Sequence, residues 1–343
     1  SFRPKENLSV AHIKYARQRG MHVHLVIPTS FEAFFEPGTA KRPGNDKFWT
    51  VYPVSKLDTT RFHGEIARIL GSIKEAGTRP DALELFNETN WVDFNGDLPI
   101  IGGGYIFDAS TPLSHPHLGT VVEGTLRYGR ALRITRHVLD SIFPNHSVPL
   151  VSSGFVYTDV QWMNSVDGSM IDPGFWFSVM AGKSTATQSK TDYTRFIRQV
   201  GVHVYPGKEN SGTVSALVDD LEERVRPVRE IVGGNHAFSM TEWGFNDWLF
   251  RNEPNPGQAR LQKHRLFMDA LNEHTSRGTR WVDAYLFSFD QNTGFKIYND
   301  DTLTTTAEIF ELYSWQTPVR TVVPVPTPRC SNTGSSEIGR AHV

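Results

Sequence analysis

Helical segments and strand-like segments alternate along most of this chain, and the alternation narrows the folds that it can adopt. Segments with apolar residues at helical spacing are each followed by a short, mostly apolar run of the kind that forms a buried strand. Six strands are expected, at residues 21–28, 81–87, 148–155, 200–206, 237–244 and 282–290. A helix is expected before each of them, including a short one at 192–199. This order predicts an α/β fold with parallel strands and right-handed crossovers.

Polar side chains at the strand ends favour a closed barrel over an open sheet. Glu88, His203, Tyr205, Glu242 and Asp290 all fall at the C-terminal ends of expected strands, and they come from four of these strands. An open sheet gathers its ligand-binding groups near one switch point. A (β/α)8 barrel collects such groups from every strand around one mouth, and roughly 250 residues suffice for it. A chain of 343 residues can therefore form a TIM barrel.

Composition excludes several classes of function. The 35 basic and 37 acidic side chains give a net charge of −2, so the chain lacks the basic character of a nucleic-acid-binding protein. No run of about 18 apolar residues is present, so no membrane span is expected. The lone cysteine, Cys330, excludes an intramolecular disulfide and a cysteine-rich metal site.

Two glutamates carry the functional signal. Glu88 lies in LELFNETN and Glu242 in SMTEWGFN, and each directly follows an apolar strand. Each also has a polar residue before it and a tryptophan close behind it. A surface loop could explain either glutamate alone, but the shared context favours a pair of functional carboxylates brought together by the barrel.

The motifs around these residues resemble those of a known family. LELFNETN is similar to the Asn-Glu signature that ends the fourth strand in clan A of the retaining glycoside hydrolases, and MTEWG is similar to the glutamate motif that ends the seventh. VHVYP resembles the sixth-strand motif. The enzymes of this clan are (β/α)8 barrels, and the strand count of this chain agrees with the assignment.

The resemblance implies a role for each matching residue. Glu242 would be the nucleophile and Glu88 the general acid and then base of a retaining β-glycosidase. Asn87 would donate a hydrogen bond to the 2-hydroxyl of the sugar. Tyr205 would orient the nucleophile, and His203 would line the same subsite. The substrate would be a polysaccharide or an oligosaccharide, and no metal or organic cofactor is expected.

Aromatic residues near the strand ends are expected to contact the sugar. Trp91 and Trp243 follow the two glutamates, and sugar rings stack on aromatic side chains. Phe289 stands on the eighth strand, where the family often carries a stacking tryptophan. Thr89 replaces the proline that the family commonly has after the first glutamate.

Two other functions remain open at this stage. His22 and His24, or His115 and His117, could belong to a metal-dependent barrel hydrolase, because histidines two apart on a strand share a face. His22 and His24 stand at the start of a strand, however, which favours a core or bottom-face role. A glycan-binding barrel without activity is the other alternative, although binding alone would not require both glutamates.

The domain organisation follows from the strand count. Residues 1–317 are expected to form the barrel with strands three to eight, so that it is incomplete at its N-terminus. Restoring about 40–70 upstream residues is expected to improve folding. Residues 318–336 resemble a Pro/Thr-rich linker to a further module, and residues 337–343 resemble a non-native tail. The protein is expected to be secreted, with its leader outside this sequence.

Overall fold

The computed structural model describes residues 3–158, 163–207, 212–287, 295, 298–299 and 302–309, and it describes the side chains of these residues from residue 10 onward except at 298–299 and 302–303. The expected linker, the expected tail, and the residues Phe289 and Asp290 lie outside these ranges. None of the helices in the described ranges has the length and apolar character needed to cross a bilayer.

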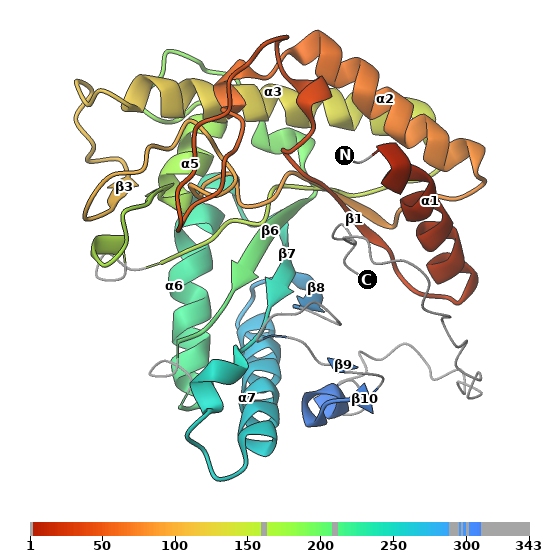
Figure 1. The fold of residues 1–343 in the computed structure, drawn as a ribbon, viewed down its shortest axis with the longest axis vertical. Coiled ribbons are helices and arrows are strands. Elements are labelled where there is room, and N and C mark those ends of the chain that lie inside the picture. The colour runs from red at the N-terminus through yellow and green to blue at the C-terminus, as the bar shows by residue number, and fades with distance from the viewer. Residues whose placement is uncertain are drawn as a thin grey trace.

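A six-stranded sheet forms the centre of the molecule (Figure 1). Its strands follow one another in the order of the chain, and every pairing between them is parallel. The strands are β1 (His24–Ile27), β2 (Ala82–Leu85), β4 (Leu150–Val151), β6 (Gln199–Val204), β7 (Ala237–Trp243) and β8 (Trp281–Leu286). The predicted α/β class and the six expected strand positions are therefore confirmed.

The sheet curls, so that side chains of its first and last strands meet. The rings of His24 on β1 and Tyr285 on β8 have centroids 5.0 Å apart and are nearly perpendicular. A flat sheet would hold strands at opposite edges far apart, since neighbouring strands lie about 4.8 Å from each other. The described strands thus form a partial (β/α)8 barrel, which corresponds to the expected strands three to eight.

Helices cover the outer face of the curl. In Figure 1, α2 and α3 run together across the top of the molecule, and α6 and α7 run together on the opposite side of the sheet. The helices are α1 (Arg3–Gln18), α2 (Thr59–Glu75), α3 (Leu118–Ile142), α5 (Pro173–Met180), α6 (Val214–Val232) and α7 (Pro256–Ser276). Two small sheets lie apart from the barrel, formed by β3 (Tyr105–Phe107) with β5 (Ser169–Ile171), and by β9 (Tyr298–Asn299) with β10 (Thr302–Leu303).

The prediction of a helix at 192–199 is wrong. The segment forms one 3-10 turn, η3 (Thr194–Phe196), and then enters β6. A helix that the sequence did not predict, α5, lies between β4 and β6, where Pro173 occupies the first turn and the Asp172 side chain caps the N–H of Phe175. Because α5 is apolar nearly all round, its sequence has no amphipathic period that would mark it as a helix.

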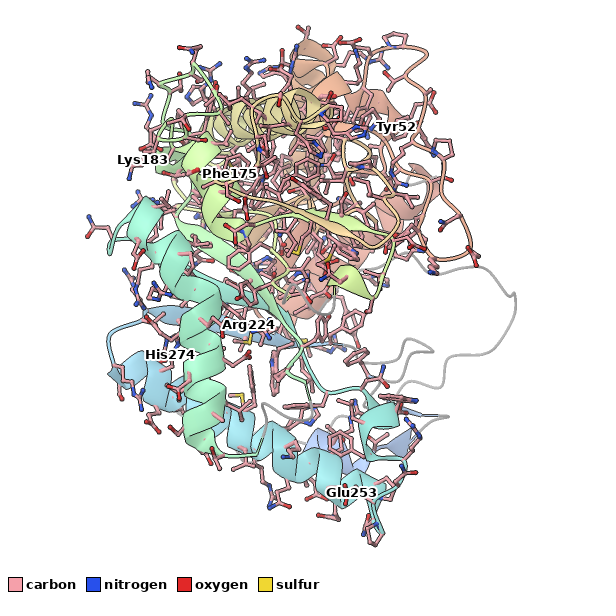
Figure 2. All side chains as sticks on the ribbon, turned by 90° about the vertical axis from the view of Figure 1, so that its left-hand side faces the viewer. Tyr52, Phe175, Lys183, Arg224, Glu253 and His274 are labelled. Atoms are coloured by element: carbon pink, nitrogen blue, oxygen red, sulfur yellow. The ribbon has the colours of Figure 1, made fainter. Side chains whose placement is uncertain are left out.

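Aromatic packing joins the helices to one another. Figure 2 shows Phe175 on α5 and Arg224 on α6 among the side chains of these helices. The indole of Trp176 stacks on Tyr128 of α3 at 5.2 Å between ring centroids. Arg224 forms a buried ion pair with Asp220 and donates to the carbonyl of Tyr157, which ties α6 to the segment after β4.

Tyr128 also fixes the ends of two strands. Its hydroxyl accepts a hydrogen bond from the N–H of Ser153 at 2.6 Å and donates to the carbonyl of Leu85 at 3.1 Å. Both of these backbone groups belong to residues that are fully buried. One side chain on α3 thereby sets the spacing between the end of β2 and the segment that follows β4.

Replacing Tyr128 by phenylalanine should lower the free energy of unfolding by about 1–3 kcal/mol, because a buried N–H and a buried carbonyl lose their partner. Urea unfolding of Tyr128→Phe measures the change. Tyr15→Phe is the control, since Tyr15 is 48% exposed and should show no effect. Equal stability of Tyr128→Phe and the wild type would contradict the structural role given to this hydroxyl.

Candidate active site

Three titratable side chains meet at the C-terminal ends of the strands. Glu88 follows β2, His203 lies on β6 and Glu242 lies on β7. His203 Nδ1 is 2.6 Å from Glu88 Oε1 and 3.6 Å from Glu242 Oε2. One ligand atom from each side chain can be chosen so that all three lie within 4.8 Å of one another. We call these three residues the carboxylate–imidazole cluster.

Irregular backbone brings the cluster together. Phe86 and Glu88 have φ angles of 68° and 44°, in the left-handed region that side chains other than glycine rarely adopt. The chain therefore turns sharply as it leaves β2, and the N–H of Trp91 closes the turn on the carbonyl of Glu88. A bulge between Val202 and His203 then sets His203 directly beside Glu242. Such departures from regular geometry are common at functional sites.

Burial and charge determine the state of His203. The side chains of Glu88, His203 and Glu242 are 13%, 1% and 8% exposed. Burial alone would lower the pKa of His203, but the charges of Glu242, Glu88 and Glu84 and the hydrogen bond with Glu88 raise it to about 9. His203 is therefore an imidazolium at neutral pH, and its Nδ1–H donates to Glu88.

Tyr205 provides a second donor to the cluster. Its hydroxyl donates to Glu242 Oε2 at 2.6 Å, and its ring packs edge-on against Phe287. Asn87 is buried between the two left-handed residues and pairs with Gly154 through the backbone. The sequence-predicted residues Asn87, Glu88, His203, Tyr205 and Glu242 thus lie at the C-terminal ends of β2, β6 and β7, on the same edge of one sheet.

The three expected aromatic contacts differ in their placement. Trp91 stands in the turn after Glu88, half-buried, with its indole N–H donating to Asp93 and its ring edge-on to Phe48. Trp243 is turned away from the cluster, because its indole is buried and stacks on Phe267 of α7 at 4.7 Å. Phe289 is outside the described ranges.

Sequence reasoning missed the layer beneath the cluster. Glu84 is fully buried on β2, and its carboxylate interacts with His24, the N–H of Gly154 and the hydroxyl of Thr241. The signal was a charged residue inside the otherwise apolar run ALELF. It was treated as part of a buried strand, although a charge buried in this way needs partners from other strands.

The histidines considered for a metal site do not gather with other ligands. His24 is buried against Glu84, and His115 stacks on Tyr105. In the described part of the chain, the one group of three or more side chains that could hold a metal ion is the carboxylate–imidazole cluster itself. There, a cation would replace the proton between His203 and Glu88.

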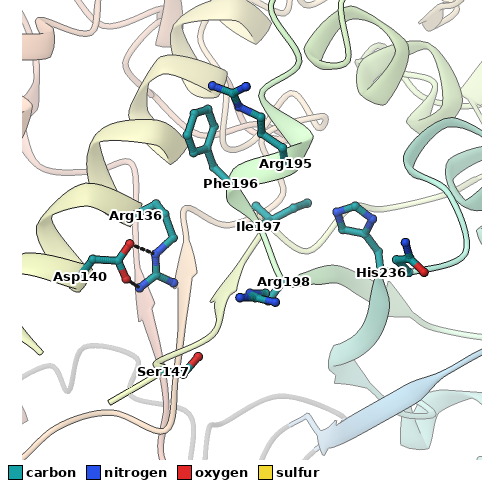
Figure 3. Close-up of a pocket in the computed structure, with 9 residues that line it drawn as sticks. Arg136, Asp140, Ser147, Arg195, Phe196, Ile197, Arg198 and His236 are labelled. Carbon is teal, nitrogen blue, oxygen red and sulfur yellow. Dashed lines mark hydrogen bonds and ion pairs between the residues drawn. The ribbon is translucent and has the colours of Figure 1, made fainter. Parts of the chain in front are cut away.

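A separate pocket lies at the other end of the strands (Figure 3). Arg198 directly precedes β6 and His236 directly precedes β7, whereas the cluster follows the C-terminal ends. The guanidinium of Arg136 is paired with Asp140, as the dashed lines in Figure 3 mark. Arg195 lies over the ring of Phe196. This pocket is remote from the cluster.

The raised pKa of His203 predicts how stability depends on pH. Because its pKa is about 9 in the folded protein and 6.5 in the unfolded chain, its contribution is fully present below pH 6.5 and is lost as pH rises through 9. The contribution should be on the order of 3 kcal/mol. Urea unfolding of the wild type and His203→Gln at several pH values measures it. A difference that stays constant from pH 6 to pH 9.5 would contradict the charged state of His203.

Gly154→Ala should displace the imidazole of His203. A Cβ at this position would lie 2.2 Å from His203 Nε2 and 2.6 Å from Thr241 Oγ1. We expect the free energy of unfolding to fall by about 1–3 kcal/mol and the imidazole resonances of His203 to shift. Gly71→Ala on α2 is the matched control, because a Cβ there meets no atom within 4 Å. Unchanged imidazole resonances in Gly154→Ala would show that the ring is not held against this glycine.

Comparisons with known proteins give a match in structure but not in sequence. No protein-family model matches the chain, and no curated protein matches it. A structure of fungal beta-1,4-galactanases is similar, with a TM-score of 0.52 and 11% identity over 90% of this chain and 82% of that one. The GH53 catalytic domain of Ignisphaera aggregans has a TM-score of 0.49 and 12% identity over 90% and 78% of the two chains.

The catalytic domain of GH30 xylanase C from Talaromyces cellulolyticus gives a TM-score of 0.49 and 11% identity over 88% of this chain and 57% of that one. At such identities, the likeness concerns the fold. The match to the galactanase covers most of both chains, so the shared fold is not confined to one part of this chain. The (β/α)8-barrel fold, first indicated by the strand count and by the motifs around Glu88 and Glu242, is thus confirmed.

Proposed function

We propose that the protein is a retaining β-glycoside hydrolase that cleaves a polysaccharide or an oligosaccharide by double displacement. One observation carries the proposal: oxygens of Glu88 and Glu242, from strands distant in sequence, lie within 4.8 Å of each other. Retaining enzymes hold their carboxyl groups about 5–5.5 Å apart, whereas inverting enzymes need about 6.5–9.5 Å to admit a water. The fold shared with a galactanase supports the same class.

In the first step, a carboxylate oxygen of Glu242 attacks the anomeric carbon. Glu88 receives a proton from the His203 imidazolium, and as the glycosidic C–O bond breaks the leaving oxygen takes that proton from the Glu88 carboxyl group. The product is a glycosyl ester on Glu242 together with the released alcohol. Glu88 is then a carboxylate.

In the second step, Glu88 acts as a base. It removes a proton from a water molecule, whose oxygen attacks the anomeric carbon and displaces Glu242. The free sugar leaves with retained configuration, the proton on Glu88 passes back to His203, and both glutamates return to their initial states. Two inversions at one carbon give net retention.

His203 and Tyr205 suit the two glutamates to these different tasks. Tyr205 donates to Glu242 at 2.6 Å, which favours the ionised form that a nucleophile requires. His203 Nδ1 is 2.6 Å from Glu88 Oε1, so a proton can pass between the imidazole and the carboxyl group without a large movement of either side chain. The cluster therefore holds both a charged nucleophile and a transferable proton.

The remaining predicted residues would bind the sugar. Asn87 supplies an amide donor next to Glu88, where the 2-hydroxyl is expected, and Trp91 offers an aromatic surface in the adjoining turn. Polymeric carbohydrate is met mainly outside cells, so we also propose that the protein is secreted. Residues 318–336 would then link the barrel to a further module.

Variants of the two glutamates should behave differently. Glu242→Ala should abolish hydrolysis of every glycoside, because no covalent intermediate can form. Glu88→Ala should lower kcat on unactivated glycosides by on the order of 10²–10⁴-fold. It should largely spare the first step on aryl glycosides whose leaving groups need no protonation. Added azide should then restore turnover and yield a glycosyl azide, which chromatography detects.

Glu75→Ala is the matched control, since Glu75 is exposed at the end of α2 and should leave the kinetics unchanged. Equal losses on activated and unactivated substrates for Glu88→Ala would contradict its role as the acid. A wild-type protein that binds glycans but hydrolyses none would instead support the inactive barrel.

The second candidate is a metal-dependent hydrolase, which the proximity of Glu88, His203 and Glu242 also favours. Dialysis against a chelator separates the two functions. Activity that falls with the chelator and returns with added zinc would support the metal enzyme, whereas unchanged activity supports double displacement. The azide product gives an independent check, because it requires a glycosyl-enzyme intermediate.

A further inference from the structure

One fully buried carboxylate takes no part in the two displacement steps. Glu84 lies on β2, four residues before Glu88, and is 0% exposed. Its neighbours Leu83 and Leu85 are also buried, but side chains alternate along a strand, so Glu84 faces the opposite side of the sheet from them. Burial of a charge is costly unless it is paired and hydrogen-bonded. The partners of Glu84 therefore show what this carboxylate does.

Three elements besides β2 supply these partners. The N–H of Gly154, just after β4, donates to Glu84 Oε1 at 2.6 Å, and the hydroxyl of Thr241 on β7 donates to the same oxygen at 3.4 Å. His24 Nε2, on β1, is 3.1 Å from Glu84 Oε2. One side chain thus connects β1, β2, β7 and the segment that follows β4.

Gly154 and Thr241, which donate to Glu84 Oε1, also lie beside the His203 imidazole. A Cβ on Gly154 would lie 2.2 Å from His203 Nε2, so the ring rests directly on the backbone of this glycine. The same Cβ would lie 2.6 Å from Thr241 Oγ1, and Thr241 immediately precedes Glu242. Any shift of Gly154 or Thr241 would therefore move the imidazole relative to both catalytic carboxylates.

We propose that Glu84 is a positioning residue, which holds Gly154 and Thr241 in place beneath the His203 imidazole and so fixes the distances from that ring to Glu88 and Glu242. The proposal rests on the proposed function and deepens it. Glu84 touches no reacting atom and acts through His203. Its negative charge adds to this role, because it contributes to the raised pKa of His203.

Other titratable groups also face Glu84, and a substitution of Glu84 leaves them in place. His24 faces it from β1 and His203 from β6. Tyr128 on α3 and Tyr285 on β8 also feel its charge, and burial raises the pKa of both hydroxyls far above the neutral range. Among these groups, His203 is the one that touches the catalytic carboxylates.

Glu84→Gln tests the proposal, because it keeps the shape of the side chain and an acceptor for Gly154 but removes the charge. With an aryl β-glycoside, kcat should fall about 10- to 100-fold while KM stays unchanged. The alkaline limb of the kcat–pH profile should move to lower pH, since loss of a negative charge lowers the pKa of His203. Titration of the His203 imidazole by NMR should show the same downward shift.

Asp97→Asn is the matched control. Asp97 is also a buried carboxylate, and it accepts from the N–H of Ser55 at 2.7 Å and from its hydroxyl at 2.5 Å, away from the cluster. Its loss should lower the melting temperature but leave the pH profile and the His203 titration unchanged. If Glu84→Gln behaves like Asp97→Asn, with wild-type kcat and an unshifted His203 midpoint, the proposal is overturned.

The NMR titration needs no substrate, which keeps the two proposals separable. A wild-type protein that hydrolyses no glycoside would overturn the proposed function. A shifted midpoint in Glu84→Gln would still show that Glu84 controls His203, and an unshifted midpoint would overturn that control whatever the activity.

Discussion

The contact of the His203 imidazole with Glu88 and Glu242 is the interaction on which the arrangement of the strand ends depends. Two carboxylates this close would repel each other in a site that is almost closed to water, since a buried charge pair is weakly screened. An imidazolium 2.6 Å from one and 3.6 Å from the other offsets that repulsion. The bulge in β6 and the left-handed turn after β2 bring His203 and Glu88 into this contact.

A buried polar layer lies inside the curled sheet beneath this contact. Barrel interiors are commonly filled with branched apolar side chains. Here His24, Glu84 and Thr241 form a hydrogen-bonded layer under the cluster. Such a layer stabilises the fold less than packed apolar groups would, because buried charges must first lose their hydration. The layer instead sets the positions of the strands, since each hydrogen bond fixes one strand relative to another.

The sequence predicted the strands and the positions of Glu88 and Glu242 at strand ends, because both leave local signals. The period of apolar residues marks strands, and Asn87-Glu88 and Glu242 stand out at strand ends. α5 was missed because an apolar helix capped by Asp172 lacks an amphipathic period. The direction of the Trp243 indole, toward Phe267, depends on packing against α7 and could not be read from the sequence. The role proposed for Glu84 depends on partners from three segments that are distant in sequence, so the local sequence could not predict it.

Two glutamates with nearly the same burial can still perform opposite tasks, because their hydrogen-bond donors differ. Tyr205 can only donate to Glu242 under ordinary conditions, as a phenol does not lose its proton near neutral pH. It therefore favours a permanently ionised carboxylate. His203 can donate its proton to Glu88 or take it back, because its Nδ1 lies 2.6 Å from Glu88 Oε1 and an imidazolium gives up a proton more readily than a phenol. The proposed division into nucleophile and acid would thus arise from β6, which supplies His203 and leads directly into Tyr205, rather than from the glutamates themselves.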